Sequence, residues 1–433
     1  MTAGDTIYAL SSGAPPAAVA IIRISGPEAG TALAALGGDL PPPRRAVLRT
    51  LKVPDSGEVL DRALVLWFPG PNTATGEDLA ELHLHGGRAV VRAVEAALAG
   101  VPGLRPAEPG AFTRRAFLSG RIDLAEAEGL SDLLFAETEA QRVAAIRMAS
   151  GHLSRQVERW REQVLRLSAL VEAELDFSDE DDVGAGVGDT VGEGVATLVA
   201  DIRAALARPR AERLRDGIRV VLAGPPNSGK STLLNTLLQR EAAIVSDIAG
   251  TTRDVIEAPV AMGGIPFVLT DTAGLREQGA EAIEAIGIQR AHDAMAGADI
   301  VLWLGAEGDG PEHPAAWEIE AQVDRGGVSR ETKRSPRHRL SARTGQGLEA
   351  LVADLIASAQ TLLPGTGEVA LNARQHQLLG ECAIALEASG SQPDLLLRAE
   401  ALRLARLALD RLLGRAHVED MLDALFGAFC IGK

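Results

Sequence analysis

The chain has 433 residues and carries 43 Lys and Arg against 59 Asp and Glu, a net charge of −16. A charge of this sign repels nucleic acid at long range, so any RNA contact has to use a local basic patch. Two cysteines are too few for the disulfide framework of a small secreted scaffold, and no segment has the length of a membrane span. We therefore expect a cytoplasmic protein of about two to four domains.

Residues 1–118 have the pattern of a compact α+β domain. Short apolar runs predict strands over residues 19–24, 63–68 and 79–84, and a helix is expected over residues 88–98. His83 and His85 share one face of the third strand, as the two residues of a metal pair would. Because no third ligand stands at a suitable spacing, a structural role is favoured.

Residues 119–213 change to helical periodicity, with apolar residues at three- and four-residue spacing from Leu124 to Leu175. The acidic run 176–182 and the glycine-rich residues 183–194 interrupt this pattern. We interpret them as a solvated connection between helices, with a cation or partner site as the less favoured alternative. A further helix is expected from about residue 195 to 206.

The most informative stretch is residues 224–231 (GPPNSGKS), which fits the phosphate-binding pattern G-x-x-x-x-G-K-S. The apolar run 218–223 precedes it as a predicted strand and a helix follows it, so backbone N–H groups and a helix N-terminus converge on an anion. Lys230 is placed to contact the β- and γ-phosphates, and the Ser231 hydroxyl to bind Mg²⁺. A glycine-rich turn that binds nothing is the disfavoured alternative.

Two later motifs indicate the kind of nucleotide-binding protein. A buried strand over residues 267–270 is expected to end at residues 271–274 (DTAG), where Asp271 reaches Mg²⁺ through water. Between the two motifs lies the polar loop 250–254, whose Thr252 can complete the metal shell once a γ-phosphate is present. This order is typical of a switch GTPase.

The guanine-reading motif Asn-Lys-x-Asp is incomplete. Another buried strand is expected over residues 299–304, and residues 340–343 (LSAR) resemble the loop that backs a guanine base. Between them the best match is residues 321–324 (AQVD), which keeps only Asp324. Loss of the Asn and Lys removes a hydrogen bond and a stacking surface, so we expect GTP to be bound with reduced base selectivity or affinity.

Helical periodicity returns in residues 371–425, after a linker at 364–367. We expect a multidomain α/β and α protein, in which the helical segments 119–213 and 363–433 form one bundle and the Ras-like P-loop GTPase domain 214–362 is inserted between them. The basic run 330–339 is interpreted as a solvated loop, with an RNA contact as the less favoured alternative.

Several unrelated stretches together resemble the tRNA modification GTPase MnmE (TrmE) family. They are the nucleotide motifs and the runs IIRISG (21–26), FPGPN (68–72), TGED (75–78), HGG (85–87), RRAFL (114–118) and CIGK (430–433). Together they span almost the whole chain and are far more specific than a phosphate loop alone.

The resemblance implies an N-terminal domain that binds folate and forms a homodimer. The family's folate-contacting residues fall on Arg23 and Glu81, on Arg121 where the family has a Lys, and on the terminal Lys433. The carrier is 5-formyltetrahydrofolate or a related tetrahydrofolate derivative. Cys430 stands where a catalytic or redox thiol has been proposed in the family.

The resemblance also implies a GTPase that is activated by K⁺ and works with an FAD-dependent partner of the MnmG type in a heterotetramer. Together they place an aminomethyl or carboxymethylaminomethyl group on C5 of the tRNA wobble uridine. The implied catalytic residues are Glu284, which orients water, with Thr252 and Lys230; Mg²⁺ is held by Ser231 and Thr252. The implied K⁺ ligands are Asn227, Ser246, Ile248 and Thr251.

The expected GTP-contacting residues come from the phosphate loop, the two switch segments and the base pocket. They are Asn227, Ser228, Gly229, Lys230, Ser231, Thr232, Ser246, Asp247, Ile248, Ala249, Gly250, Thr251, Thr252, Asp271, Thr272, Ala273, Gly274, Asp324, Ser341, Ala342 and Arg343.

Two alternatives stay open at this point. A ribosome-assembly GTPase would share the nucleotide domain, but it would not need the IIRISG and CIGK runs. A folate-binding scaffold with an inert G domain would explain the missing Asn and Lys, but the intact Lys230, Ser231, Thr252 and Asp271 argue against it.

Overall fold

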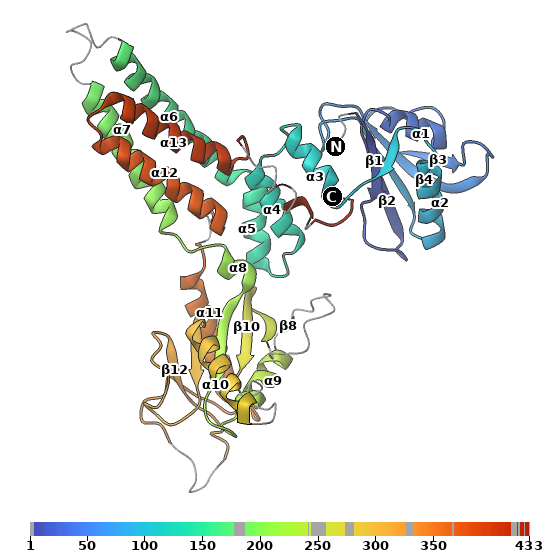
Figure 1. Ribbon diagram of the computed structural model, residues 1–433. Helices are drawn as coiled ribbons and strands as arrows, with labels where there is room; N and C mark the ends of the chain where they lie inside the picture. Colours follow the sequence, from blue (N-terminus) through green and yellow to red (C-terminus); the bar gives the residue numbers. More distant parts are fainter. Residues whose placement is uncertain are drawn as a thin grey trace. The chain divides into compact units, whose positions relative to one another are not determined.

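The computed structural model describes residues 4–176, 187–240, 242–243, 257–272, 281–325, 332–365, 368–416, 422, 425–427 and 429–432. At residues 187, 242–243 and 281–288 only the backbone is described. The chain divides into two compact units (Figure 1). The first unit is Met1–Ser131 with Asp410–Lys433, and the second unit is Asp132–Leu409. Among the described residues, no helix combines the length and the apolar composition that a membrane span needs.

The first unit is built on a six-stranded sheet with the order β3-β4-β5-β2-β1-β6. Neighbouring strands are antiparallel except β1 and β6, which are parallel. The strands and the helix expected from the sequence are confirmed. The strands are β1 (Thr6–Leu10), β2 (Val19–Ser25), β3 (Val47–Lys52), β4 (Val59–Phe68), β5 (Leu79–His85) and β6 (Leu104–Pro106).

The two faces of this sheet have different coverings. Two helices, α1 (Ala29–Gly37) and α2 (Arg88–Ala99), bury Ile22 and its neighbours on one face. On the other face a smaller core joins the first strand to α3 (Ala111–Leu118) through Phe112. Successive side chains of a strand point to opposite faces, so alternation along β2 sends its polar residues to this second face.

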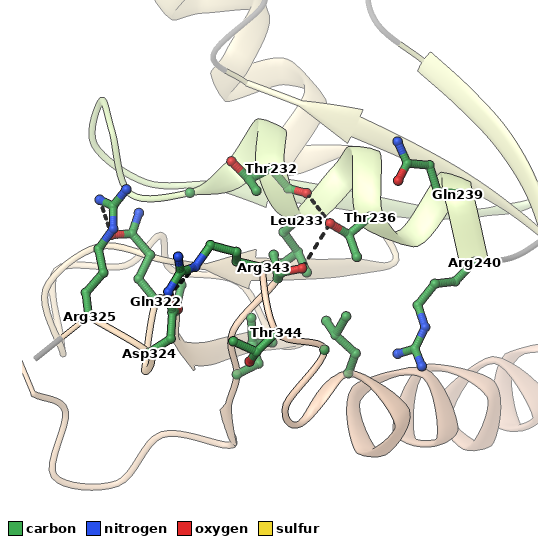
Figure 2. Close-up of a pocket in the computed structure, with 16 residues that line it drawn as sticks. Thr232, Leu233, Thr236, Gln239, Arg240, Gln322, Asp324, Arg325, Arg343 and Thr344 are labelled. Carbon is green, nitrogen blue, oxygen red and sulfur yellow. Dashed lines mark hydrogen bonds and ion pairs between the residues drawn. The ribbon is translucent and has the colours of Figure 1, made fainter.

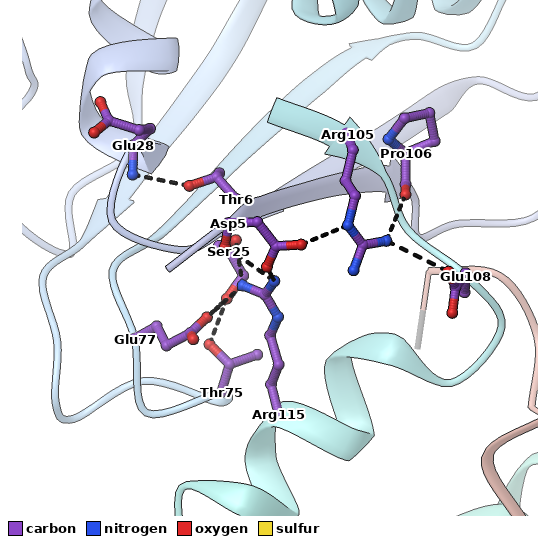
Figure 3. Close-up of polar contacts among 10 residues, drawn as sticks. All are labelled: Asp5, Thr6, Ser25, Glu28, Thr75, Glu77, Arg105, Pro106, Glu108 and Arg115. Atoms are coloured by element: carbon purple, nitrogen blue, oxygen red, sulfur yellow. Dashed lines mark hydrogen bonds and ion pairs between the residues drawn. The ribbon is translucent and has the colours of Figure 1, made fainter. Parts of the chain in front are cut away.

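A buried guanidinium ties three segments of the first unit together (Figure 3). Arg115 of α3 donates to Asp5 Oδ1 at 2.6 Å, to Glu77 Oε2 at 2.7 Å and to the carbonyl of Ser25 at 2.9 Å. Desolvation by itself would raise the pKa of Asp5, but the hydrogen bonds and charges of Arg105 and Arg115 lower it below the ordinary value. The carboxylate therefore stays ionised and holds the N-terminal segment against α3.

The C-terminal residues return to the first strand of this unit. The Ser11 hydroxyl donates to the carbonyl of Gly432 at 2.8 Å. Gly432 has a φ of +97°, and a Cβ built there would lie 2.1 Å from the carbonyl oxygen of Leu10. Only glycine fits this approach, because any larger residue would clash with the backbone of β1.

The second unit contains a seven-stranded sheet with the order β13-β12-β11-β7-β10-β9-β8. Its central strands are parallel and mostly buried, which accounts for their continuous apolar sequences, and β9 is antiparallel to both its neighbours. The strands are β7 (Ile218–Ala223), β8 (Ala242–Ala243), β9 (Glu257–Met262), β10 (Ile265–Asp271), β11 (Ile300–Trp303), β12 (Ala316–Glu320) and β13 (His338–Arg339).

The remaining helices fall into two groups, apart from α4 (Leu124–Leu134), which contains one of the two boundaries between the units. Four accompany the seven-stranded sheet: α8 (Glu212–Asp216), α9 (Lys230–Arg240), α10 (Glu281–Ala296) and α11 (Leu348–Leu362). The others are α5 (Glu139–Ala149), α6 (His152–Asp176), α7 (Val187–Leu206), α12 (Ala373–Ser391) and α13 (Leu395–Leu412). α7 packs against both α6 and α12.

The expected start of α7 near residue 195 is wrong, because the helix begins at Val187 within the glycine-rich stretch. Buried residues at helical spacing, among them Val191 and Val195, give this stretch an apolar face. A Cβ at Gly194 would lie 2.7 Å from Leu167 Cδ2 of α6. The glycine therefore allows a close helix contact and does not mark a loop.

The N-terminus of α5 is attached to the sheet of the second unit. The backbone N–H of Ala140 donates to the carbonyl of Gly264, in the turn between β9 and β10, at 3.1 Å. The Gln141 side chain donates to the carbonyl of Leu214 in α8 at 3.1 Å. A helix of the helical group therefore holds the turn that lies between the two predicted switch segments.

Candidate functional site

The phosphate loop joins β7 to α9 at the carboxyl edge of the parallel strands. Its first and last glycines, Gly224 and Gly229, have φ of +148° and +99°. A Cβ at Gly224 would lie 3.1 Å from the backbone nitrogen of Gly305, and one at Gly229 would lie 3.1 Å from Gln322 Nε2. The positive φ favours glycine at both positions, as the sequence pattern predicted, and a Cβ at either would crowd its neighbour.

Lys230 and Ser231 lie where the loop enters α9. The Lys230 side chain is buried, and its ammonium donates to the carbonyls of Gly224 and Pro225 at 3.0 and 2.8 Å. The Ser231 hydroxyl donates to Asp271 Oδ2 at 2.5 Å, which brings the two motifs of the sequence together. A hydroxyl and a carboxylate are hard oxygen donors, so this pair fits Mg²⁺.

The loop borders a cavity of about 510 Å³, a size suited to a small-molecule ligand. Asn227 lies on the wall with an exposed side chain and a φ of +63°, a conformation that Asn adopts more readily than most residues. The Ser228 Oγ is buried and has no hydrogen-bond partner among the described residues. Both Lys230 and Thr272 also line this cavity.

A second cavity of about 580 Å³, shown in Figure 2, shares Gly229 and Thr232 with the first. Its wall includes Asp324, whose Oδ1 accepts from the Ser341 hydroxyl at 2.5 Å and whose Oδ2 accepts from Arg343 Nε at 2.8 Å. Ala342 also lines it. The structure thus brings the expected base-recognition residues together on one wall.

The carboxylate of Asp324 is kept ionised by its neighbours. The hydrogen bond from Ser341 has the largest effect and lowers the pKa of Asp324. Desolvation raises this pKa, but the hydrogen bond and charge of Arg343 lower it further, so the pKa lies below its ordinary value. At neutral pH the group is an acceptor, which is what the N1–H and amino group of guanine require.

Part of the expected nucleotide site lies outside the described residues. This part comprises Ser246, Asp247, Ile248, Ala249, Gly250, Thr251, Thr252, Ala273 and Gly274, and the side chain of Glu284. The backbone of Glu284 belongs to α10.

Two residues that line both cavities, Gln322 and Arg325, were not predicted as site residues. Gln322 stands at the Lys position of the incomplete Asn-Lys-x-Asp motif, so that position was the signal available in the sequence. The sequence pattern by itself indicates a lost contact there. In the structure the Gln322 Nε2 donates to the carbonyl of Asn227 in the phosphate loop at 3.0 Å.

The folate candidates lie in the first unit. Arg23 and Glu81 are cross-strand partners, and the guanidinium contacts Glu81 Oε1 at 3.0 and 3.2 Å. The Arg23 guanidinium also lies 5.8 Å from the centre of the Phe112 ring. Arg121 instead donates to the carbonyl of Thr73 at 3.1 Å.

Lys433, the fourth folate candidate, lies outside the described residues, although Gly432 beside it is held at β1. Cys430 is free and exposed. Cys382 is buried, and burial raises the pKa of its thiol to about 12, so it stays protonated. Of the two thiols, Cys430 is the one open to chemistry.

The two histidines of β5 that could suggest a metal pair each lie beside a carboxylate. His83 Nε2 lies 3.2 Å from Glu81 Oε2, and His85 Nδ1 lies 2.7 Å from Asp61 Oδ1, as expected of a structural role.

The described part of the basic run 330–339 is also tied into the second unit. Lys333 is buried and pairs with Glu318 at 2.5 Å. Arg337 pairs with Asp354 at 2.7 Å and stacks on a tryptophan ring at 3.9 Å. Most of the described run is exposed, as expected of a solvated loop, but Lys333 is buried, and the ion pairs of Lys333 and Arg337 disfavour an RNA contact.

Comparisons with known proteins show which proteins this chain is similar to. Two family models match, GTP-binding protein TrmE N-terminus over residues 6–121 and MnmE helical domain over residues 124–430. The tRNA modification GTPase MnmE of Erythrobacter litoralis is 62% identical over 429 residues, which cover 99% of this chain and 100% of that protein. The protein of the same name from Novosphingobium aromaticivorans is 58% identical over 437 residues, with coverages of 99% and 100%.

Among solved structures, the G domain of the T. maritima FeoB iron transporter is 25% identical and covers 33% of this chain and 99% of its own. Its TM-score of 0.23 is too low to support an argument. The matched family models and the two sheets agree with the expected multidomain α/β protein with a helical region.

The geometry of Asp324 generates a prediction about base selectivity. We expect GTP to be preferred over ATP, because this carboxylate accepts hydrogen bonds from the N1–H and the amino group of guanine. Asp324→Asn should weaken GTP binding by about tenfold or more, since a hydrogen bond to a charged group is lost, and should improve binding of xanthosine triphosphate, whose 2-oxo group accepts from an amide. Displacement of a fluorescent GDP analogue by each nucleotide measures both effects.

The exposed Asp201→Asn on α7 is the matched control and should leave every affinity unchanged. Equal affinity of the unmodified protein for ATP and GTP would remove Asp324 from base recognition. An unaltered order of GTP over xanthosine triphosphate in Asp324→Asn would do the same.

Proposed function

The chain belongs to the tRNA modification GTPase MnmE family and is a GTPase that acts in tRNA modification; from this premise we propose that K⁺ activates its hydrolysis of GTP. We propose further that hydrolysis drives modification of C5 of the wobble uridine with an FAD-dependent partner of the MnmG type. The observation that carries the hydrolysis of GTP is the meeting of Lys230, Ser231 and Asp271 at one edge of the sheet, and the rest of the proposal follows from the family.

The two alternatives now have less support. A ribosome-assembly GTPase does not account for the match to the TrmE N-terminus model. A scaffold with an inert G domain disagrees with the GTPase identity of the family and with the intact arrangement of the phosphate loop.

Hydrolysis is assigned to residues of the second unit. When GTP binds, the Lys230 ammonium exchanges the carbonyls of the loop for phosphate oxygens, which are stronger acceptors. Glu284 orients a water whose oxygen forms a bond to the γ-phosphorus while the bond to the β–γ bridging oxygen breaks, and GDP and phosphate leave. Ser231 and Thr252, with Asp271 behind them, would hold Mg²⁺, which would supply positive charge to the phosphates.

The proposed K⁺ ligands are the Asn227 side chain with Ser246, Ile248 and Thr251. Support comes from the exposed amide of Asn227 at the rim of the phosphate cavity. A monovalent cation held there would supply positive charge that other GTPases obtain from an arginine finger. Thr252 is proposed to sense the γ-phosphate from the same segment.

A tetrahydrofolate derivative such as 5-formyltetrahydrofolate is proposed to bind Arg23, Glu81, Arg121 and Lys433. The support is chemical: a guanidinium pairs with the glutamate carboxylates of a folate, and the Glu81 carboxylate accepts from the donors of a pterin ring. The derivative would supply a one-carbon unit for the modification. Cys430, which is exposed beside Gly432, is the proposed thiol at this place.

We also propose the domain limits 1–118, 119–213, 214–362 and 363–433, with the third domain inserted in the helical domain. Contact between α7 and α12, whose sequences flank the third domain, supports this arrangement. A homodimer, assembly with the partner into a heterotetramer, binding of tRNA and a cytoplasmic location complete the proposal.

The first test concerns the cation. GTP hydrolysis should be fast in K⁺ and at least tenfold slower when Na⁺ replaces it, because Asn227 stands where the family places its side-chain K⁺ ligand. Asn227→Ala should lose this response while GDP binding survives, which phosphate release and fluorescent GDP titration measure together. A rate that is the same in both salts would rule out K⁺ activation.

The second test concerns coupling between hydrolysis and modification. Glu284→Ala should leave binding of GTP and folate nearly intact but abolish hydrolysis and wobble-uridine modification together, because the acid aligns water only after nucleotide has bound. Nucleoside analysis of tRNA from cells that carry only this variant measures the outcome. Glu312→Ala, an exposed acid of the second unit, is the matched control. Normal modification without hydrolysis would separate the GTPase cycle from the chemistry.

A further inference from the structure

The base and phosphate cavities share one wall, formed in part by Gln322 (Figure 2). Gln322 follows the last residue of β12 by two positions and has a φ of +58°, a conformation that few non-glycine residues adopt. The strained backbone turns its side chain toward the phosphate loop. A residue held this way points to a specific contact, because such conformations persist only where the surroundings impose them.

The contact is a chain of two hydrogen bonds. The Gln322 Nε2 donates to the carbonyl of Asn227 at 3.0 Å, and its Oε1 accepts from Arg325 Nη1 at 3.1 Å. The amide lies so close to the loop that a Cβ on Gly229 would approach it to 3.1 Å. Both polar atoms of the Gln322 amide therefore have a partner. The Nε2 contacts the phosphate loop, and the Oε1 contacts a guanidinium that lines both cavities.

The bond to Asn227 has a geometric consequence for the next residue. In a trans peptide the carbonyl and the following N–H point in opposite directions. Holding the Asn227 carbonyl toward Gln322 therefore turns the Ser228 N–H into the loop, where it makes only a long contact of 3.4 Å to the carbonyl of Pro225. The Lys230 ammonium contacts the same Pro225 carbonyl at 2.8 Å.

We propose that Gln322 is a positioning residue for the nucleotide, which holds the phosphate loop so that the Ser228 N–H faces the phosphates. Gln322 stands where the complete Asn-Lys-x-Asp motif has its Lys, and its amide supplies an N–H donor without a charge. This inference rests on nucleotide binding at the loop, and it adds a link between the wall of the base pocket and the phosphates. The amide acts through Asn227 and does not read the base.

The test compares side chains of similar length with and without a donor. Gln322→Met keeps the length and loses the N–H, so we expect the Kd for GTP and GDP to rise by about three- to tenfold, the worth of one hydrogen bond. Gln322→Lys restores a donor that can reach the Asn227 carbonyl and should return both values to within about twofold. GMP, which lacks the phosphates beyond the first, should lose less affinity in Gln322→Met than GDP does.

Gln377→Met is the matched control, because Gln377 is an exposed amide on α12 that contacts only Glu381 in the described part of the chain. Thermal melting without nucleotide checks that each variant folds, and Gln322→Ala serves as a second variant without a donor. Unchanged affinity in Gln322→Met and Gln322→Ala, failure of Gln322→Lys to restore binding, or equal losses for GMP and GDP would each overturn the proposal. A lack of GDP binding by the unmodified protein would instead overturn the nucleotide site itself.

Discussion

The site depends on one constraint, the tight passage of the chain from β7 through the phosphate loop into α9. A Cβ at Gly224 would crowd the backbone that follows β11, and a Cβ at Gly229 would crowd the side chain of Gln322. Parallel pairing of β7 with β10 and β11 brings the carboxyl ends of all three strands to one edge. This register places Asp271 beside Leu222, near the start of the loop, and its carboxylate accepts from Ser231 at the start of α9.

The local part of this arrangement could be predicted from the sequence. The phosphate loop needs only a strand, two glycines and a helix that are adjacent in the chain, so their spacing in the sequence is enough to predict it. The pairing of Asp271 with Ser231 also follows from local pattern, because Asp271 comes directly after a predicted buried strand. Asp324 was proposed from its motif position alone, and β12, which precedes it, was not predicted. The role of Gln322 could not be predicted, because it depends on a hydrogen bond to Asn227, 95 residues earlier in the chain. The start of α7 was missed for a related reason, since Gly194 serves a helix contact that exists only after packing.

The second unit also joins the nucleotide site to helices outside the sheet. β10 ends at Asp271, and the turn that precedes it accepts a hydrogen bond from the N-terminus of α5 through Gly264. The two ends of one rigid strand therefore touch the phosphate site and the helical group. Coupling between hydrolysis and a distant reaction needs an element of this kind, whose position both sites can bias.

The central claim is that phosphate loop and base pocket form one continuous nucleotide site along this sheet edge. Hydrogen–deuterium exchange of the full chain, with and without a non-hydrolysable GTP analogue and Mg²⁺, tests it most directly. The account predicts slower exchange in peptides that cover residues 224–232, 321–325 and 341–344 together, because all three line the two cavities. Slower exchange in the first peptide alone, with no change at residues 321–325 and 341–344, would contradict it.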